Sequence, residues 1–357
     1  MENTNNDSNT KDLSTINLKL EEVANHFQDL VLWNAWTLLA LKNASSYLIA
    51  CVGGGIKIIE NGEEIYIRLA TEAPHYEIYG AAYINTLNTY LFYDGKTSAI
   101  LRKDIDDQPP YPFIEDLPLG YKEGSFFRYS KVNNRLLAIQ YVDKTQQKIV
   151  IINPEKKEVE FDLEGAGDHI NELRLLGEKE DRIVAVNPKG QLVLYEVDYE
   201  QKTGSILGRH QIELSREKEE YALSVSECQK QKYLYVEIAR KGEGDTYLCS
   251  RIAIFRLDGD NFVQETIVDM SGSDTSEKYQ IHPCGYAGKY ALWVGFSFWN
   301  PRVCHLYAFD TESGELRELK EKNQEHGLEA ILKVERLDGK FYFTGNGAKV
   351  LRLSVDL

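Results

Sequence analysis

The sequence predicts an all-β fold in which seven sheets of four antiparallel strands close into a ring. Three observations support this prediction. The apolar runs are short and bounded by turn residues, one such run recurs at a nearly regular spacing, and the chain stops before its last sheet is complete. Short runs rich in Val, Ile, Leu, Tyr and Phe are typical of strands and lack the period of amphipathic helices.

Asx-Gly pairs separate several of these runs. Such pairs supply the positive φ angles that tight primed turns need, so we expect consecutive strands to form antiparallel hairpins. The pairs are Asn61-Gly62, Asp94-Gly95, Asp258-Gly259, Asp338-Gly339 and Asn346-Gly347.

One strand-like run of similar composition, such as YLIACV or YLYVE, occurs seven times. The successive starts lie 43 to 57 residues apart, at Tyr47, Tyr90, Arg135, Arg182, Tyr233, Tyr290 and Phe341. A spacing of roughly 40 to 50 residues is typical of a four-stranded propeller blade. In the third unit the four runs are FFRYSKV, RLLAIQYV, KIVIINP and EVEFDL. Because one such sheet cannot bury both of its faces, we expect a seven-bladed β-propeller.

The last unit lacks a strand. It contains FYFTG and AKVLRLSV but ends at Leu357, whereas STINLKL, from Ser14 to Leu20, alternates polar and apolar residues before the first complete unit. We therefore expect this N-terminal segment to pair beside residues 349–355 and to close the ring as the fourth strand of the last blade.

The first dozen residues, MENTNNDSNTKD, are almost entirely polar. Such a segment cannot bury enough apolar surface to offset the entropy lost on ordering. We expect residues 1–12 to form a disordered tail and residues 13–357 to form a single β-propeller domain.

The sequence predicts a cytoplasmic protein, with the nucleus as an open alternative. It begins without the basic and apolar stretch of a secretory signal, and its apolar segments are too short to span a membrane. The cysteines are odd in number and scattered, which favours reduced packing residues over a disulfide framework. They are Cys51, Cys228, Cys249, Cys284 and Cys304.

A formal net charge of −15 disfavours nucleic acids and anionic membranes as partners. The sequence also has no run of Lys and Arg interleaved with aromatic residues. We expect a protein or peptide partner, with a basic protein surface as the electrostatically easier one. The chain is expected to be monomeric on its own or to be a subunit of a complex.

Three segments, GGGIKIIENGEE from Gly53, PKGQLVLYEVD from Pro188 and NGAKVLRLSVDL from Asn346, match the turn, third strand and Asp-containing end of a WD40 repeat. With these segments the chain resembles WD40-type propellers over nearly all of its length after the tail. No Trp-Asp or Gly-His dipeptide is present, so the polar network of that family is not carried over. RVCHLYAFDTESGELREL, from Arg302, is equally similar to quinoprotein-type propeller repeats.

One group of residues could be a zinc site. His282 and Cys284 alternate along one predicted strand, and Cys304 and His305 are neighbours on another. Adjacent residues of a strand point to opposite faces, so Cys304 and His305 cannot readily bind one ion together. We therefore expect structural histidines and buried cysteines, and neither a metal nor a cofactor.

No catalytic residues are identified. Gly53-Gly54-Gly55 lacks the spacing of a dinucleotide or phosphate loop, which favours a glycine hairpin at a place where a Cβ would clash. The acidic pairs Asp106-Asp107 and Glu115-Asp116 occur in turn-like segments, where exposed charge is the ordinary interpretation.

A candidate binding surface lies in the segment GFSFWNPR, which contains Phe298, Trp299 and Arg302. Aromatic and arginine side chains exposed at a hairpin tip would suit an interaction hot spot. The alternative, that these rings pack against the next blade, remains open.

The function predicted from these features is a non-catalytic protein-protein interaction scaffold that uses the propeller rims and the central entrance. Two alternatives remain. One is a propeller enzyme of hydrolase or lyase type with a channel-lining active site, and the other is a structural subunit of a larger cytoskeletal assembly.

Overall fold

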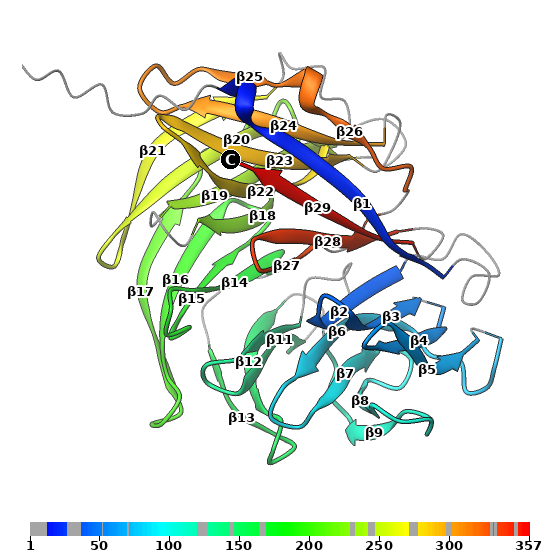
Figure 1. Cartoon of the computed structure of the whole chain (residues 1–357). Coiled ribbons are helices and arrows are strands. Elements are labelled where there is room, and N and C mark those ends of the chain that lie inside the picture. The colour runs from blue at the N-terminus through cyan, green and yellow to red at the C-terminus, as the bar shows by residue number, and fades with distance from the viewer. Residues whose placement is uncertain are drawn as a thin grey trace, which may run out of the picture.

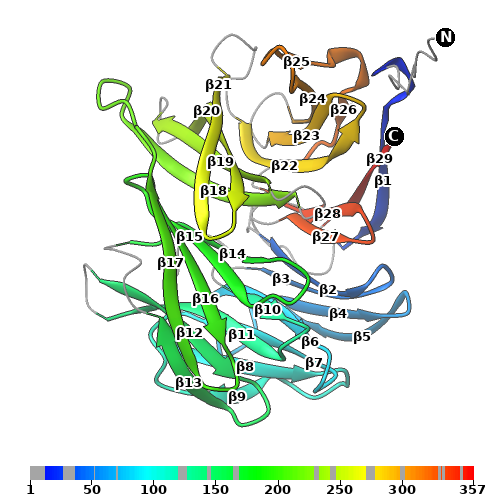
Figure 2. The same ribbon diagram turned by 90° about the vertical axis from the view of Figure 1, so that its left-hand side faces the viewer.

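The computed structural model describes residues 13–26, 37–51, 53–69, 71–119, 127–142, 146–163, 169–228, 233–241, 247–270, 278–297, 302–328, 331, 334–345 and 349–357. These residues form seven antiparallel sheets, or blades, that are arranged around a common centre (Figures 1 and 2). The predicted seven-bladed β-propeller is therefore confirmed.

The first four blades follow one another along the chain, each with its strands in sequence order. Blade 1 contains β2 (Thr37–Asn43), β3 (Ser46–Cys51), β4 (Ile56–Glu60) and β5 (Glu63–Arg68). Blade 2 contains β6 (Ile78–Ile84), β7 (Thr89–Asp94), β8 (Ala99–Asp104) and β9 (Tyr111–Ile114). Blade 3 contains β10 (Arg128–Ser130), β11 (Arg135–Tyr141), β12 (Gln147–Asn153) and β13 (Glu158–Leu163). Blade 4 contains β14 (Glu172–Leu176), β15 (Arg182–Val186), β16 (Gln191–Asp198) and β17 (Thr203–Gln211).

Blade 5 follows the same order, blade 6 has one additional short strand, and blade 7 takes its fourth strand from the start of the chain. Blade 5 contains β18 (Glu220–Cys228), β19 (Tyr233–Lys241), β20 (Tyr247–Asp258) and β21 (Asn261–Asp269). Blade 6 contains β22 (Lys278–Ala287), β23 (Tyr290–Ser297), β24 (Val303–Asp310) and β25 (Leu316–Glu318), and the short β26 (Gln324–Glu325) also pairs with β24. Blade 7 contains β27 (Val334–Leu337), β28 (Lys340–Thr344), β29 (Lys349–Asp356) and, from the start of the chain, β1 (Asn17–Asn25). Two short 3₁₀ helices, η1 (Leu13–Thr15) and η3 (Lys320–Lys322), complete the described elements.

The N-terminal strand closes the ring. β1 pairs antiparallel with β29, with Leu18 opposite Val355 and Leu20 opposite Leu353. The blue and red strands lie side by side in both views (Figures 1 and 2). The predicted pairing of the two ends of the propeller is confirmed.

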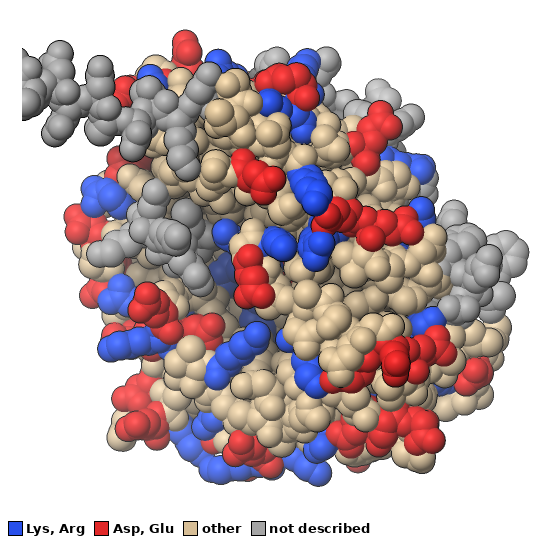
Figure 3. Space-filling model, in the orientation of Figure 1, with Lys and Arg blue, Asp and Glu red and all other residues tan. Residues whose placement is uncertain are grey.

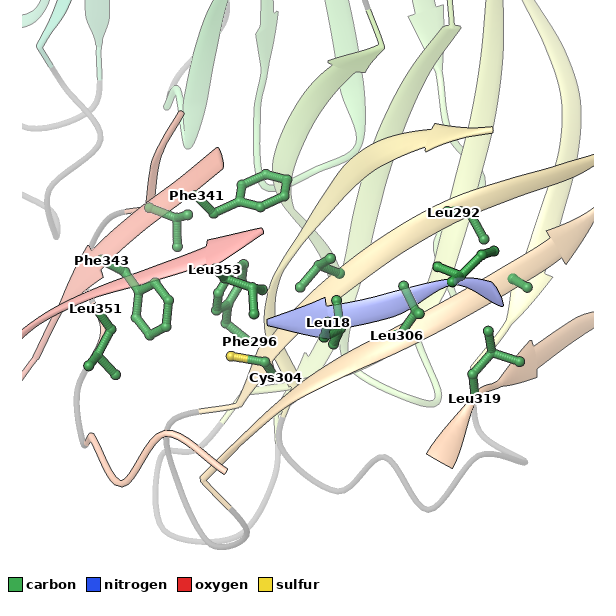
Figure 4. Close-up of a cluster of buried hydrophobic side chains, with 14 of the residues drawn as sticks. Leu18, Leu292, Phe296, Cys304, Leu306, Leu319, Phe341, Phe343, Leu351 and Leu353 are labelled. Atoms are coloured by element: carbon green, nitrogen blue, oxygen red, sulfur yellow. The ribbon is translucent and has the colours of Figure 1, made fainter. Parts of the chain in front are cut away.

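Each hydrophobic cluster of the core is shared by two neighbouring blades. The cluster in Figure 4 joins Leu292, Phe296 and Leu306 of blade 6 to Phe343 and Leu353 of blade 7. Corresponding clusters join all other consecutive blades, including blade 7 and blade 1. Both faces of the middle strands are therefore covered, which explains why the recurring second-strand runs are largely apolar.

The Asx-Gly prediction holds at two positions and differs at two. Asn61-Gly62 and Asp338-Gly339 form two-residue turns in which both residues have positive φ, as in type I′. Asp94 instead ends β7, and its carboxylate caps the longer turn 95–98 by accepting bonds from the Lys96 N–H and the Thr97 hydroxyl. Asp258 is the last strand residue before the two-residue loop 259–260, in which Gly259 has a φ of 61°.

Asn346-Gly347 lies outside the described residues, as does the tail 1–12.

The glycine hairpin at Gly54 is confirmed. Gly54 has a φ of 97°, and a Cβ at this position would lie 2.9 Å from the backbone N and O of Tyr76. The β3–β4 hairpin of blade 1 therefore packs backbone to backbone against the segment that enters blade 2, and only glycine fits this approach.

The cysteines that pack inside the sheets include Cys51, Cys249 and Cys304, all buried. Burial raises the pKa of the Cys51 thiol to about 12, so this thiol stays protonated at neutral pH.

Among the described residues, no helix has the length and apolar character needed to cross a membrane.

Candidate functional site

A cavity of about 950 Å³ occupies the centre of the ring. Its wall includes residues from the first strand of every blade, namely Ala40, Ala81, Arg128, Arg174, Ser226, His282 and Arg336. The cavity is therefore the central channel of the propeller. It reaches the face that carries Lys131 in the β10–β11 turn and Asp338 and Gly339 in the β27–β28 turn, and we call this the channel face.

Basic side chains predominate in this wall. Among the residues that the structure describes, Arg128, Lys131, Arg174 and Arg336 line the cavity together with two acidic residues, Glu335 and Asp338. Figure 3 shows a hollow near the middle of the molecule, with Lys and Arg side chains at its edge and inside it. The channel thus differs in charge from the chain as a whole, whose net charge is −15.

Two of the arginines share one carboxylate. Arg128 Nη2 donates to Glu172 Oε1 at 2.5 Å, and Arg174 Nε lies 3.6 Å from the same oxygen. Arg174 Nε also donates to the backbone carbonyl of Val225 on blade 5, at 2.9 Å. These contacts hold Arg174 across the space between blades 4 and 5, so its position in the channel is built by the fold.

Arg336 is held from blade 6. Its Nη1 lies 3.4 Å from the Pro283 carbonyl, and its guanidinium carbon lies 5.5 Å from the centre of the Phe341 ring. A guanidinium at this distance from an aromatic ring gains from the cation–π attraction. The side chain nevertheless remains exposed, because it faces the channel.

His282 also lines the channel. Its ring contacts Phe296 and Phe341 and is only half-buried by accessible area, because it borders the channel. It nevertheless lies deep within the fold. This deep position, followed by the positive charges of Arg174, Arg336 and Arg128, lowers the pKa of His282 to about 3. His282 is therefore neutral at physiological pH.

The basic wall was not predicted from the sequence. Its arginines come from the first strands of blades 3, 4 and 7, so they form no run of basic residues along the chain. The one signal was positional: Arg128, Arg174 and Arg336 each fall in the strand that precedes a recurring second-strand run.

Of the three candidate binding residues predicted from the sequence, the structure describes Arg302. Phe298 and Trp299 lie outside the described residues. Arg302 is partly exposed just before β24, where its Nη1 lies 3.5 Å from the Gly327 carbonyl and its own carbonyl accepts the His326 N–H at 2.9 Å. Because the β23–β24 connection is at the opposite end of its blade from the β22–β23 turn, Arg302 lies on the face opposite the channel face.

The four residues weighed as a zinc site do not form one. His282 and Cys284 are on β22, whereas Cys304 and His305 are on β24, with β23 between the two strands. Cys304 is buried in the cluster between blades 6 and 7, and His305 Nδ1 bonds Glu318 Oε1 at 2.6 Å. In the part of the chain that the structure describes, no three His, Cys, Asp or Glu side chains are grouped to hold a metal ion.

Comparison with known proteins gives similarity at the level of structure. No family model matches the sequence, and no curated protein matches it at a significant level. Among solved structures, the chain is similar to the WD40 β-propeller domain of Doa1, with a TM-score of 0.58 and 8% identity over 94% of this chain and 96% of that one.

Two further structures are similar over a smaller part of the chain. The β-propeller domain of Myceliophteria thermophila Cps50 (Swd1) has a TM-score of 0.52 and 14% identity over 73% of this chain and 80% of that one. A protein from Lactobacillus plantarum has a TM-score of 0.55 and 14% identity over 79% of this chain and 82% of that one. At such low identities the similarity establishes the fold alone, which is the fold of the WD40-type β-propellers.

Proposed function

We propose that the protein is a non-catalytic scaffold that holds a segment of a partner protein in the central channel, at the channel face. The observation that carries this proposal is the cavity itself. It is bordered by all seven blades, reaches one face, and has a volume of about 950 Å³, which lies in the range of sites that enclose several chemical groups of a ligand. Propellers of this fold commonly act as interaction scaffolds.

The state of the channel groups supports binding over catalysis. A general acid or base works best when its pKa lies near the working pH. The pKa of His282 is lowered to about 3, and the carboxylate of Glu172 is engaged by Arg128. Glu172 holds Arg128 and Arg174 in position, and the lowered pKa of His282 makes its imidazole a weak general base near neutral pH.

Phe298, Trp299 and Arg302 remain a second proposed contact. Arg302 lies opposite the channel face, so this contact would engage a different part of a partner. The proposal for the channel does not depend on it.

Site-specific photo-crosslinking tests the proposed function. A photoreactive amino acid is placed at Lys131 or Asp338, both exposed at the channel mouth, and in a control protein at Glu217, which is exposed on the opposite face in the turn before β18. In cells that make the protein, we expect the same partner to crosslink from Lys131 and Asp338 and not from Glu217. A partner that crosslinks equally from Glu217, or none from the channel mouth, would contradict the proposal.

A further inference from the structure

The channel offers hydrogen-bond donors and positive charge on rigid supports. Arg174 uses its Nε for the Val225 carbonyl, and Arg336 uses one Nη for the Pro283 carbonyl. A guanidinium has five N–H donors in a planar fork, which suits the two oxygens of a carboxylate or phosphate. Both side chains therefore keep donor groups beyond the contacts that position them, and both line the cavity.

A third arginine has an unused donor. The Nε of Arg128 is buried and has no hydrogen-bond partner among the described residues, although its Nη2 pairs with Glu172. A buried N–H without an acceptor is energetically unfavourable. The Arg128 guanidinium also borders the channel, so it adds positive charge to the wall beside Arg174 and Arg336.

The acidic groups of the site do not cancel its basic groups. Glu172 lies behind the wall and is shared between Arg128 and Arg174, while Glu335 and Asp338 are the acidic side chains of the lining. Within the described residues, four basic side chains line the same cavity, one more than these three acidic groups. In a confined space with low-dielectric walls, this excess is screened less than it would be on an open surface.

We infer that the channel receives an acidic segment of the partner, whose anionic side chains pair with Arg174 and Arg336 beside Arg128. This inference rests on the proposed function and names the chemistry of the ligand. The bound group is a carboxylate or a phosphate carried on a peptide. An acidic ligand is the opposite of the basic partner surface that the net charge of the chain favoured.

The location of the charge explains why a short peptide fits better than a nucleic acid. A nucleic acid binds through an extended array of basic residues, whereas this chain has a net charge of −15 and the basic side chains of this wall border one confined cavity. An acidic segment that enters the channel contacts the basic wall and leaves the acidic exterior in solvent.

Fluorescence anisotropy with a labelled hexaglutamate peptide tests the inference on the whole chain. We expect saturable binding that weakens with salt, and we expect Arg336→Gln and Arg174→Gln each to weaken it about tenfold, as for loss of a charge-assisted hydrogen bond. Arg317→Gln is the matched control, because Arg317 is an exposed arginine on β25 that packs over Tyr290, outside the channel. It should bind as the unmodified chain does.

Arg336→Gln is the decisive variant, because Arg336 is exposed and contacts blade 6 only through a long bond of 3.4 Å to the Pro283 carbonyl, whereas Arg174 bonds blade 5 at 2.9 Å and also approaches Glu172. Its loss should therefore change thermal unfolding less than the loss of Arg174. A phosphoserine peptide and inorganic phosphate serve as further probes. Tighter binding of either peptide than of inorganic phosphate, with loss in Arg336→Gln, supports the inference. Inorganic phosphate binding as tightly as the peptides, or equal binding by Arg336→Gln and Arg317→Gln, would overturn it.

The two proposals fail in different ways. If a partner crosslinks from Lys131 but hexaglutamate neither binds nor competes with it, the acidic-segment inference is wrong and the scaffold proposal stands. If hexaglutamate binds through Arg336 but no partner crosslinks at the channel mouth, the scaffold proposal fails, and the acidic-segment inference fails with it.

Discussion

Gly54 ties the end of one hairpin to the backbone of the next blade. Its φ is 97°, and a Cβ would clash with Tyr76 backbone atoms at 2.9 Å. We expect Gly54→Ala to lower the free energy of unfolding by about 3 kcal/mol, because it adds a backbone clash to an unfavourable φ. Gly62 is the control, since it has a φ of 85° but no atom within 4 Å of the position that a Cβ would occupy.

Gly62→Ala should therefore cost only about 1 kcal/mol, which is the effect of the φ angle alone. Urea unfolding of both variants measures the difference. Equal losses would show that the approach of the two backbones is not tight.

His282 makes stability depend on pH. Its pKa is lowered from 6.5 to about 3 in the folded chain, so between these values the unfolded chain binds more protons than the folded one. The part of the unfolding free energy that depends on His282 staying neutral is therefore fully present above pH 6.5 and is lost as the pH falls towards 3. We expect the unfolding free energy of the unmodified chain to fall more steeply between about pH 6.5 and 4 than that of His282→Gln. Parallel pH profiles from urea unfolding would contradict a buried neutral histidine.

Single residues of the site were the hardest to predict. Arg128, Arg174 and Arg336 meet because three first strands, far apart in sequence, face one axis. A pattern in one sequence shows which residues are basic, but not which strand faces the axis or which of its residues reach the channel. Net charge was no guide, because it sums the exterior and the channel together.

At the scale of elements, we expect β1 to stabilise the closed ring, because it pairs with β29 as the outer strand of blade 7. Leu18 is buried in the cluster between blades 6 and 7. We expect Leu18→Ala to lower the free energy of unfolding by about 2 to 4 kcal/mol, as for other buried leucines. Lys19 is the next residue of β1, and its side chain is largely exposed. Lys19→Ala should therefore change the free energy of unfolding by less than about 0.5 kcal/mol. Similar values for the two variants would mean that β1 adds little to closure.

The elements themselves were largely predictable from the sequence. The recurring runs correspond to β3, β7, β11, β15, β19, β23 and β28, each the second strand of its blade. They could be identified because burial on both faces makes them largely apolar. The turns were less predictable, since Asp94 uses its carboxylate as a cap and Asp258 pairs within the sheet, and the dipeptide alone does not distinguish these roles from a primed turn.

At the scale of the whole molecule, the ring creates the site. Each blade packs on two neighbours through a shared apolar cluster, and pairing of β1 with β29 completes the last blade. Closure brings seven first strands around one cavity, in which basic side chains are concentrated within an acidic protein. The interfaces between blades therefore stabilise the ring, and the channel is the binding site that we propose.

Hydrogen–deuterium exchange of the partner complex tests this account most directly. With the crosslinked partner bound, we predict that exchange slows at the turns 131–134 and 338–339 and in first strands such as β14 and β27, whereas the outer strands β5 and β13 are unchanged. Slower exchange confined to outer strands, with the turns at the channel mouth unaffected, would contradict the claim that the channel is the binding site.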